Sequence, residues 1–195
     1  MYGLMRITPV APDIIRVSFV KGVTEKIAAT GWMAKAEEAF SWSARESKSV
    51  VEIAAGEITV RVDKRSGAVS FWNRENQLLL AENAAEPRVI GEEGSWVFFD
   101  WDKKERIKAK GMLDTDFLGV TLNARYISFG GKKHRMPLVL SNRGYGIAAA
   151  AKNTVLLCDI KTYGQYLYAE GERQLDYYFI CGEKPENIIT RYKGL

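Results

Sequence analysis

Short runs in which hydrophobic and polar residues alternate recur along the whole chain. The clearest is ITVRVD at 58–63, where every second residue is apolar. Because successive side chains of a strand point to opposite faces, this pattern predicts a strand with one buried face. The following residues, 64–67, are turn formers that end in glycine, and the apolar alternation returns at Val69 and Phe71. The stretch therefore predicts a β-hairpin.

Similar runs predict further strands on both sides of this hairpin. They are expected within 6–21, as a strand pair or one bent strand, and at 78–80, 95–99, 105–110, 117–129, 136–141, 147–151 paired with 155–160, 163–169 and 175–182. Residues 22–45 stay open between helix and loop with strand, because they contain helix formers without a clear period. Many short strands joined by turns are typical of an all-β antiparallel β-sandwich. The absence of repeats and long linkers predicts a single domain over 1–195.

In the last residues, the apolar positions follow the spacing of a helix rather than the alternation of a strand. Pro185 suits the first turn of a helix, and Ile188, Ile189 and Tyr192 fall on one helical face. Residues 183–195 are therefore predicted to form a short C-terminal helix.

The composition is ordinary for a globular protein, with 47% hydrophobic and 27% charged residues and a net charge of +4. The basic clusters at 103–110 and 132–135 match no nucleic-acid motif, so no nucleic-acid partner is predicted. Cys158 and Cys181 lie far apart without CxxC spacing, which favours free buried thiols over a disulfide framework or metal knuckle. The chain has no signal-peptide pattern and no apolar stretch of membrane-spanning length, so a cytoplasmic protein without membrane contact is predicted.

Catalytic groups are scarce in this sequence. The single histidine, His134, excludes a multi-histidine zinc site or a two-histidine acid/base pair, and no phosphate loop, GxGxxG or GxSxG motif is present. We therefore predict no catalytic residues, no metal and no cofactor in this chain. Asp100 and Asp102 flank Trp101, but a solvated turn beside a packed tryptophan explains them better than catalysis. The aromatic residues that could stack on sugar rings are Trp72, Trp96, Trp101, Tyr163, Tyr166 and Tyr168, although packing in or around the core is the simpler interpretation.

The most informative stretch is MPLVLSNRGYG at 136–146. Pro137 stands at the start of the predicted strand, where its missing N–H does least harm. Gly144 and Gly146 flank Tyr145, which allows the backbone a positive φ or a close approach to another segment. The stretch predicts a strand that runs into a tight turn, with alternate residues facing opposite sides.

Three segments in order, 136–146, LDYYFICG at 175–182 and PENIITRYK at 185–193, resemble the end of the N-terminal domain of glycoside hydrolase family 31. This is the α-glucosidase and α-xylosidase family. The meander from 58 to Glu82, with its LLLAE ending, also resembles that domain. The resemblance implies a galactose-mutarotase-like β-sandwich whose exit helix at 183–195 leads into a catalytic (β/α)8 barrel that would begin after Leu195.

In this family the resemblance implies that both catalytic carboxylates lie on the barrel, the nucleophile in a D-M-N-E-like motif. No such motif occurs in this chain. The resemblance further implies that a loop at 125–135 reaches over the barrel mouth and shapes the substrate pocket. The family's acidic residue is missing there, because no acid occurs between Phe117 and Cys158. The basic residues Lys132, Lys133, His134 and Arg135 are therefore expected at the rim of the substrate pocket.

The leading hypothesis is a noncatalytic N-terminal domain that docks on its own C-terminal barrel in a retaining α-glycosidase acting on terminal α-linked glucose or xylose. A carbohydrate substrate is then expected only in the intact enzyme, and whether this chain counts as an enzyme stays open. An exposed docking face would also favour self-association into a homo-oligomer. The alternatives are a free-standing carbohydrate-binding or interaction module and a structural sandwich without a ligand. The sugar itself is not predicted.

Overall fold

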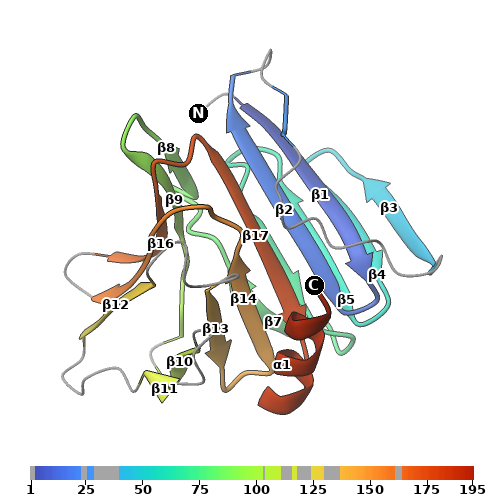
Figure 1. Cartoon of the computed structure of the whole chain (residues 1–195). Coiled ribbons are helices and arrows are strands. Elements are labelled where there is room, and N and C mark those ends of the chain that lie inside the picture. Colours follow the sequence, from blue (N-terminus) through green and yellow to red (C-terminus); the bar gives the residue numbers. More distant parts are fainter. Residues whose placement is uncertain are drawn as a thin grey trace.

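The computed structural model describes residues 3–22, 26–28, 40–102, 104–110, 116–117, 124–129, 137–160 and 164–195. These residues form three antiparallel sheets and one short C-terminal helix, which confirms the predicted all-β sandwich. Figure 1 shows the long strands of the seven-stranded sheet, here called the central sheet, crossing the molecule, with the other strands arranged around them.

The seven-stranded sheet contains the N-terminal hairpin and the last strand side by side. Its order is β1 (Gly3–Ala11), β2 (Ile14–Lys21), β17 (Gln174–Cys181), β14 (Tyr145–Ala149), β13 (Leu138–Ser141), β10 (Ile107–Lys110) and β11 (Asp116–Phe117). Both ends of the described chain thus pair in one sheet, through β2 and β17. The predicted strand within 6–21 is a hairpin of two strands, not one bent strand.

The second sheet is a simple meander. Its strands follow the chain in order: β3 (Trp42–Glu46), β4 (Val50–Ala55), β5 (Ile58–Asp63), β6 (Val69–Trp72) and β7 (Leu78–Ala81). The hairpin predicted from the alternation at 58–63 is confirmed as β5 and β6. Of the open stretch 22–45, the described part includes the beginning of β3, and residues 23–25 and 29–39 lie outside the described residues.

The third sheet has the order β12 (Ala124–Phe129), β15 (Val155–Ile160), β16 (Gly164–Glu170), β9 (Gly94–Phe98) and β8 (Arg88–Ile90). The predicted pairing of 147–151 with 155–160 is wrong. These segments are β14 and β15, which follow each other in sequence but belong to different sheets. Both edges of β14 are already paired, with β13 and β17. No edge is left for β15, so the chain crosses to the third sheet, where β15 pairs with β12 and β16.

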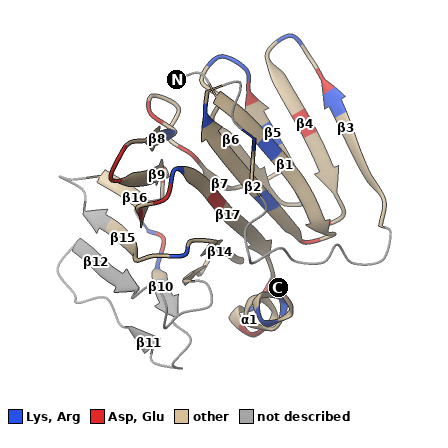
Figure 2. Ribbon diagram, turned by 45° about the horizontal axis from the view of Figure 1, so that its top comes forward, with Lys and Arg blue, Asp and Glu red and all other residues tan. Residues whose placement is uncertain are grey.

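Strand β17 of the seven-stranded sheet is buried on both faces. Along β17, Tyr177 and Phe179 face the large core shared with the other two sheets, whereas Tyr178 and Ile180 face a smaller core under the helix. This explains why β17 is a nearly continuous apolar run, and Figure 2 shows that it carries a single acidic position while charges gather at turns and outer strands.

Strand β13 has the predicted orientation of its side chains. Leu138 and Leu140 face the smaller core and Val139 faces the larger one. Pro137 immediately precedes the strand. The turn that follows contains Gly144 with φ 82°, which a residue with a side chain rarely adopts.

Helix α1 (Pro185–Gly194) covers β13, β14 and β17, as Figure 1 shows. The predicted helix and the position of Pro185 in its first turn are confirmed. Ile188 is fully buried against the smaller core. A Cβ at Gly146 of β14 would lie 2.7 Å from the Ile188 side chain, so the glycine permits close packing of the helix on the sheet. Arg191 holds the helix further, through an ion pair with Asp13 and a 2.5 Å hydrogen bond to the Cys181 carbonyl.

Candidate functional site

Several of the residues predicted from the sequence cannot be placed. Lys132, Lys133, His134 and Arg135, the expected pocket rim, lie outside the described residues, and so does Tyr163. The segment that contains the four basic residues is followed directly by Pro137 and β13. The loop expected at 125–135 is wrong in its first part, because residues 124–129 form strand β12, which pairs with β15.

The acids around Trp101 behave as the simpler interpretation predicts. Trp101 is buried, whereas Asp100 and Asp102 are exposed. Asp100 accepts a 2.8 Å hydrogen bond from the Asn83 amide, and Asp102 accepts one from the backbone N–H of Lys104. The two carboxylates cap a solvated loop and do not form a catalytic pair.

The aromatic candidates also have protein partners. Trp96 stacks on Tyr168 with ring centroids 4.5 Å apart, and Tyr166 meets Phe98 edge to face. The Arg61 guanidinium lies 4.5 Å from the Trp72 ring centroid. Among the tryptophans that the structure describes, only Trp42 is exposed, so a row of exposed tryptophans is not found there. This arrangement offers no aromatic platform of the kind a free-standing sugar-binding module would present.

The turn between β13 and β14 is held by a buried carboxylate that the sequence analysis did not single out. The Glu105 side chain is fully buried, and its Oε1 accepts hydrogen bonds from the hydroxyls of Ser141 and Tyr145. Its Oε2 accepts a 3.2 Å hydrogen bond from the Asp102 N–H. The Arg143 guanidinium, which is about a third exposed, lies 3.9 Å away. Burial and the nearby Glu105 charge raise the pKa of the Tyr145 phenol, so it stays protonated as a donor.

A second buried carboxylate lies where all three sheets meet. Glu82, directly after β7, is fully buried and forms an ion pair with Arg88 of β8. The Tyr177 hydroxyl of β17 donates to Glu82 Oε1 at 2.7 Å, and the Val69 N–H of β6 donates to Oε2 at 2.8 Å. Burial raises the pKa of Glu82, opposed by the Arg88 charge and these donors, and burial with the Glu82 charge raises the pKa of Tyr177.

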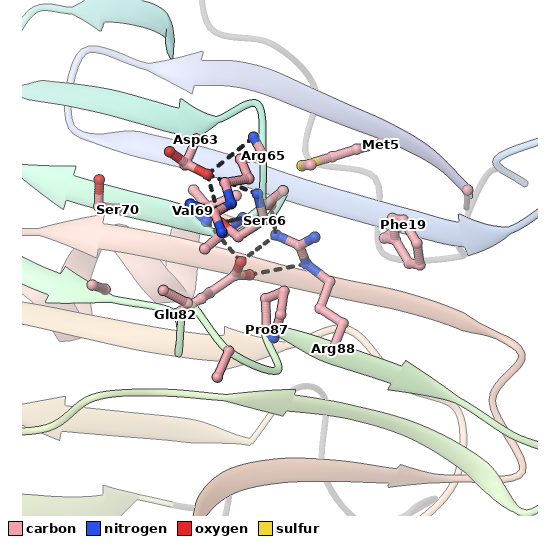
Figure 3. Close-up of a pocket in the computed structure, with 16 residues that line it drawn as sticks. Met5, Phe19, Asp63, Arg65, Ser66, Val69, Ser70, Glu82, Pro87 and Arg88 are labelled. Atoms are coloured by element: carbon pink, nitrogen blue, oxygen red, sulfur yellow. Dashed lines mark hydrogen bonds and ion pairs between the residues drawn. The ribbon is translucent and has the colours of Figure 1, made fainter. Parts of the chain in front are cut away.

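Beside this cluster is a cavity of about 820 Å³, drawn in Figure 3. Its walls come from β1 and β2 on one side, from the β5–β6 turn and β6 on another, and from residues 84–88 on a third. Glu82 and Arg88 lie in its lining, with Met5 and Phe19 across from them. One sequence signal points to this site, the acid that ends the LLLAE run, but none points to its partners.

The described residues contain no group of three or more His, Cys, Asp or Glu side chains placed to hold a metal ion. Both cysteines are free thiols, and burial raises the pKa of Cys181. Within the described ranges, no helix has the length and apolar character to cross a membrane.

No family model matches the chain, and no curated protein matches it in sequence. Solved structures do match its fold. An α-xylosidase of glycoside hydrolase family 31 from a soil metagenome, solved with xylose, matches with a TM-score of 0.76 and 20% identity, over 98% of this chain and 32% of its own. For a family-31 dextranase from Flavobacterium johnsoniae the TM-score is 0.77 and the identity 14%, over 97% of this chain and 25% of the dextranase.

The cycloalternan-forming enzyme from Listeria monocytogenes gives a TM-score of 0.72 and 16% identity, over 97% of this chain and 19% of the enzyme. The chain thus spans about a fifth to a third of the length of these proteins. Its fold is that of a part of family-31 glycoside hydrolases, and the resemblance found in the sequence is confirmed at the level of the fold.

Proposed function

We propose that this chain is the noncatalytic N-terminal domain of a retaining α-glycosidase that acts on terminal α-linked glucose or xylose. The observation that carries the proposal is the coverage of the structural matches. Almost the whole chain matches family-31 enzymes, while most of each enzyme has no counterpart in it. A domain of a larger hydrolase explains both facts.

The chemistry of the described acids agrees with a noncatalytic role. A retaining glycosidase needs two carboxyl groups about 5 Å apart that face the same substrate bond. The buried acids Glu82, Glu105 and Asp176 are instead each bound by protein donors, and they lie in separate clusters. Catalysis is therefore assigned to the barrel that would follow this domain.

In the intact enzyme, the domain would dock on that barrel and lend the segment that follows β12, with the four basic residues at 132–135, to the substrate pocket. Support for this comes from the position of the segment between β12 and β13, two strands that are each paired within a sheet. Helix α1, bound to the sheet through Ile188 and Arg191, would similarly give the chain a fixed direction where it leaves the sandwich.

The proposal is tested with the product of the complete natural gene. Hydrolysis of p-nitrophenyl α-glucoside or α-xyloside by that protein is expected, together with a barrel sequence after residue 195 that carries the nucleophilic Asp. A reading frame that closes at residue 195 would overturn the proposal and leave the binding-module alternative. In that case sugar affinity of the chain itself becomes the deciding measurement.

The pocket-rim role is tested separately in the same full-length enzyme. Replacing Lys132, Lys133, His134 and Arg135 by alanine should change KM or leaving-group preference. A matched control replaces three exposed basic residues elsewhere, Lys48, Lys152 and Arg173, for an equal loss of formal charge at neutral pH. Equal kinetics of the two variants on several disaccharides would exclude the rim role. Self-association of the isolated chain also stays a prediction, and sedimentation showing a monomer at all concentrations would contradict it.

A further inference from the structure

The cavity at the junction of the three sheets contains a buried cation with unused hydrogen-bonding capacity. The side chain of Arg88 is 4% exposed. Its Nε donates to Glu82 Oε1 at 3.1 Å, and its Nη2 donates to Glu82 Oε2 and, at 2.8 Å, to the carbonyl of Gly67. The remaining nitrogen, Nη1, has no hydrogen-bond partner in the described structure, so two N–H donors of a nearly buried guanidinium are left over.

These donors face open space. A Cβ built on Gly67 would have Arg88 Nη1 as its only neighbour within 4 Å, at 3.9 Å. Both residues line the cavity, and Figure 3 shows the guanidinium standing between Glu82 and the strand that carries Phe19. Arg88 Nη1 is not among the buried polar atoms without a partner, so these donors open onto the cavity and are available to an acceptor that enters it from outside the chain.

The charges of the lining select against an ionic ligand. Arg88 is already neutralised by Glu82. At the rim, the single cation of Arg65 is balanced in formal charge by Asp63, whose Oδ1 accepts hydrogen bonds from the backbone N–H groups of Arg65 and Ser66. A ligand anion would gain little from a paired arginine and would be repelled by Glu82, so an uncharged oxygen acceptor fits best.

The rest of the lining fits a ligand with both hydroxyl groups and aliphatic faces. Asp63 at the rim can accept a hydrogen bond from a hydroxyl, and Met5, Ala84, Ala85 and Pro87 supply apolar wall. The volume of about 820 Å³ lies in the range of small-molecule pockets. The Phe19 ring is covered by the Arg88 guanidinium, 5.3 Å from the ring centroid, so it is not a stacking platform and recognition rests on hydrogen bonds.

We propose that this cavity is a second, noncatalytic binding site for an uncharged polyhydroxyl ligand of mono- to disaccharide size. Arg88 Nη1 donates to a ligand hydroxyl oxygen, and Asp63 accepts from another hydroxyl. The site lies wholly within this chain, so the proposal stands or falls independently of whether a catalytic barrel follows residue 195.

The test is an NMR titration of the chain with ¹⁵N-labelled arginine, using xylose, glucose and maltose as probes. A saturable shift of the Arg88 side-chain resonances is expected, with a dissociation constant of about 1–10 mM because no ring stacks on the sugar. Glucuronate, which adds a carboxylate to the same ring, should bind more weakly than glucose. Unchanged Arg88 resonances with all three sugars would overturn the proposal, and so would tighter binding of glucuronate, which would identify an anion site.

The variant Ala85→Trp fills the cavity from its exposed rim and leaves the Glu82–Arg88 pair intact. It should weaken binding by about tenfold or more. The control Ala44→Trp places the same side chain on exposed strand β3, outside the cavity, and should bind as the wild type does. Equal affinity of the two variants would show that the sugar binds elsewhere and would overturn the assignment. Because neither variant removes a buried charge, the result does not depend on an Arg88 variant that folds.

Discussion

Two fully buried carboxylates, Glu82 and Glu105, are compensated in different ways within one sandwich. Glu82 has a guanidinium in direct contact, and Arg88 is itself buried. Glu105 relies on two hydroxyls and a backbone N–H, with its nearest cation, the partly exposed Arg143, 3.9 Å away. Each also receives a hydrogen bond from a buried tyrosine, Tyr177 or Tyr145.

The two clusters therefore differ in role: the Glu82 cluster borders a cavity, and the Glu105 cluster holds a turn in place. The ion pair of Glu82 borders a cavity and leaves donors of Arg88 unused. The hydroxyl cluster of Glu105 joins the loop after β9 to the turn after β13. A charged pair can thus remain available for an outside ligand, whereas the hydroxyl cluster uses its groups to fix one turn.

The largest effect should follow from removing the cation of the Glu82 cluster. Arg88→Met leaves a fully buried carboxylate without its charge partner and should lower the free energy of unfolding by about 3–5 kcal/mol. The double variant Glu82→Gln/Arg88→Met should recover most of this loss, since no charge is then left buried. Urea unfolding measures both variants, and a loss below about 1 kcal/mol for the single variant would contradict the ion-pair interpretation.

Replacing the two buried tyrosines by phenylalanine should lower the free energy of unfolding by different amounts. Tyr145→Phe removes a donor from a carboxylate without a close cation and should cost about 2–3 kcal/mol. Tyr177→Phe removes a donor from Glu82, which keeps Arg88 and the Val69 N–H, and should cost about 1–2 kcal/mol. Unfolding of the two variants under one set of conditions gives the order, and the reverse order would show that Arg88 compensates Glu82 poorly.

Alkaline pH should destabilise the fold through both tyrosines. Their pKa values are raised in the folded state by burial and by the neighbouring carboxylates, so the stabilisation is complete below the unfolded pKa of about 10 and is lost as the pH rises above it. Each tyrosine should lower the unfolding free energy by about 1.4 kcal/mol per pH unit there. Tyr177→Phe should therefore show a shallower decline between pH 9 and about pH 11 than the wild type. Parallel curves would mean that Tyr177 ionises equally in both states.

The smallest effect is expected at Arg143. Its guanidinium is partly exposed, 3.9 Å from Glu105, and donates to the Leu78 carbonyl at 2.5 Å. Arg143→Met should cost at most about 1 kcal/mol, as for solvent-screened pairs. A loss as large as that of Arg88→Met would show that Glu105 depends on a cation after all, and the two clusters would then be equivalent.

Local patterns in the sequence were sufficient for many of the strands and for the helix, although they did not predict β3, β4 or β8. The alternation at 58–63 and the turn that follows it correspond to the β5–β6 hairpin, and Pro185 with Ile188 corresponds to helix α1. Leu138, Val139 and Leu140 alternate between the two cores as their spacing predicts. These features depend on neighbouring residues only, because side-chain direction along a strand or helix follows from its period.

Sheet membership and the buried charges depended on residues far apart in the chain. Strands β14 and β15 follow each other closely, yet they lie in different sheets because each finds its partners elsewhere. Glu82 and Tyr177 are 95 positions apart, and Glu105 and Tyr145 are 40 apart. In the sequence, a buried charged residue at a strand end cannot be told from a solvated one, because the neighbouring residues along the chain are of the same kind. Only the tertiary structure brings the donors that make its burial possible, so only the tertiary structure decided which acids are buried and where the cavity lies.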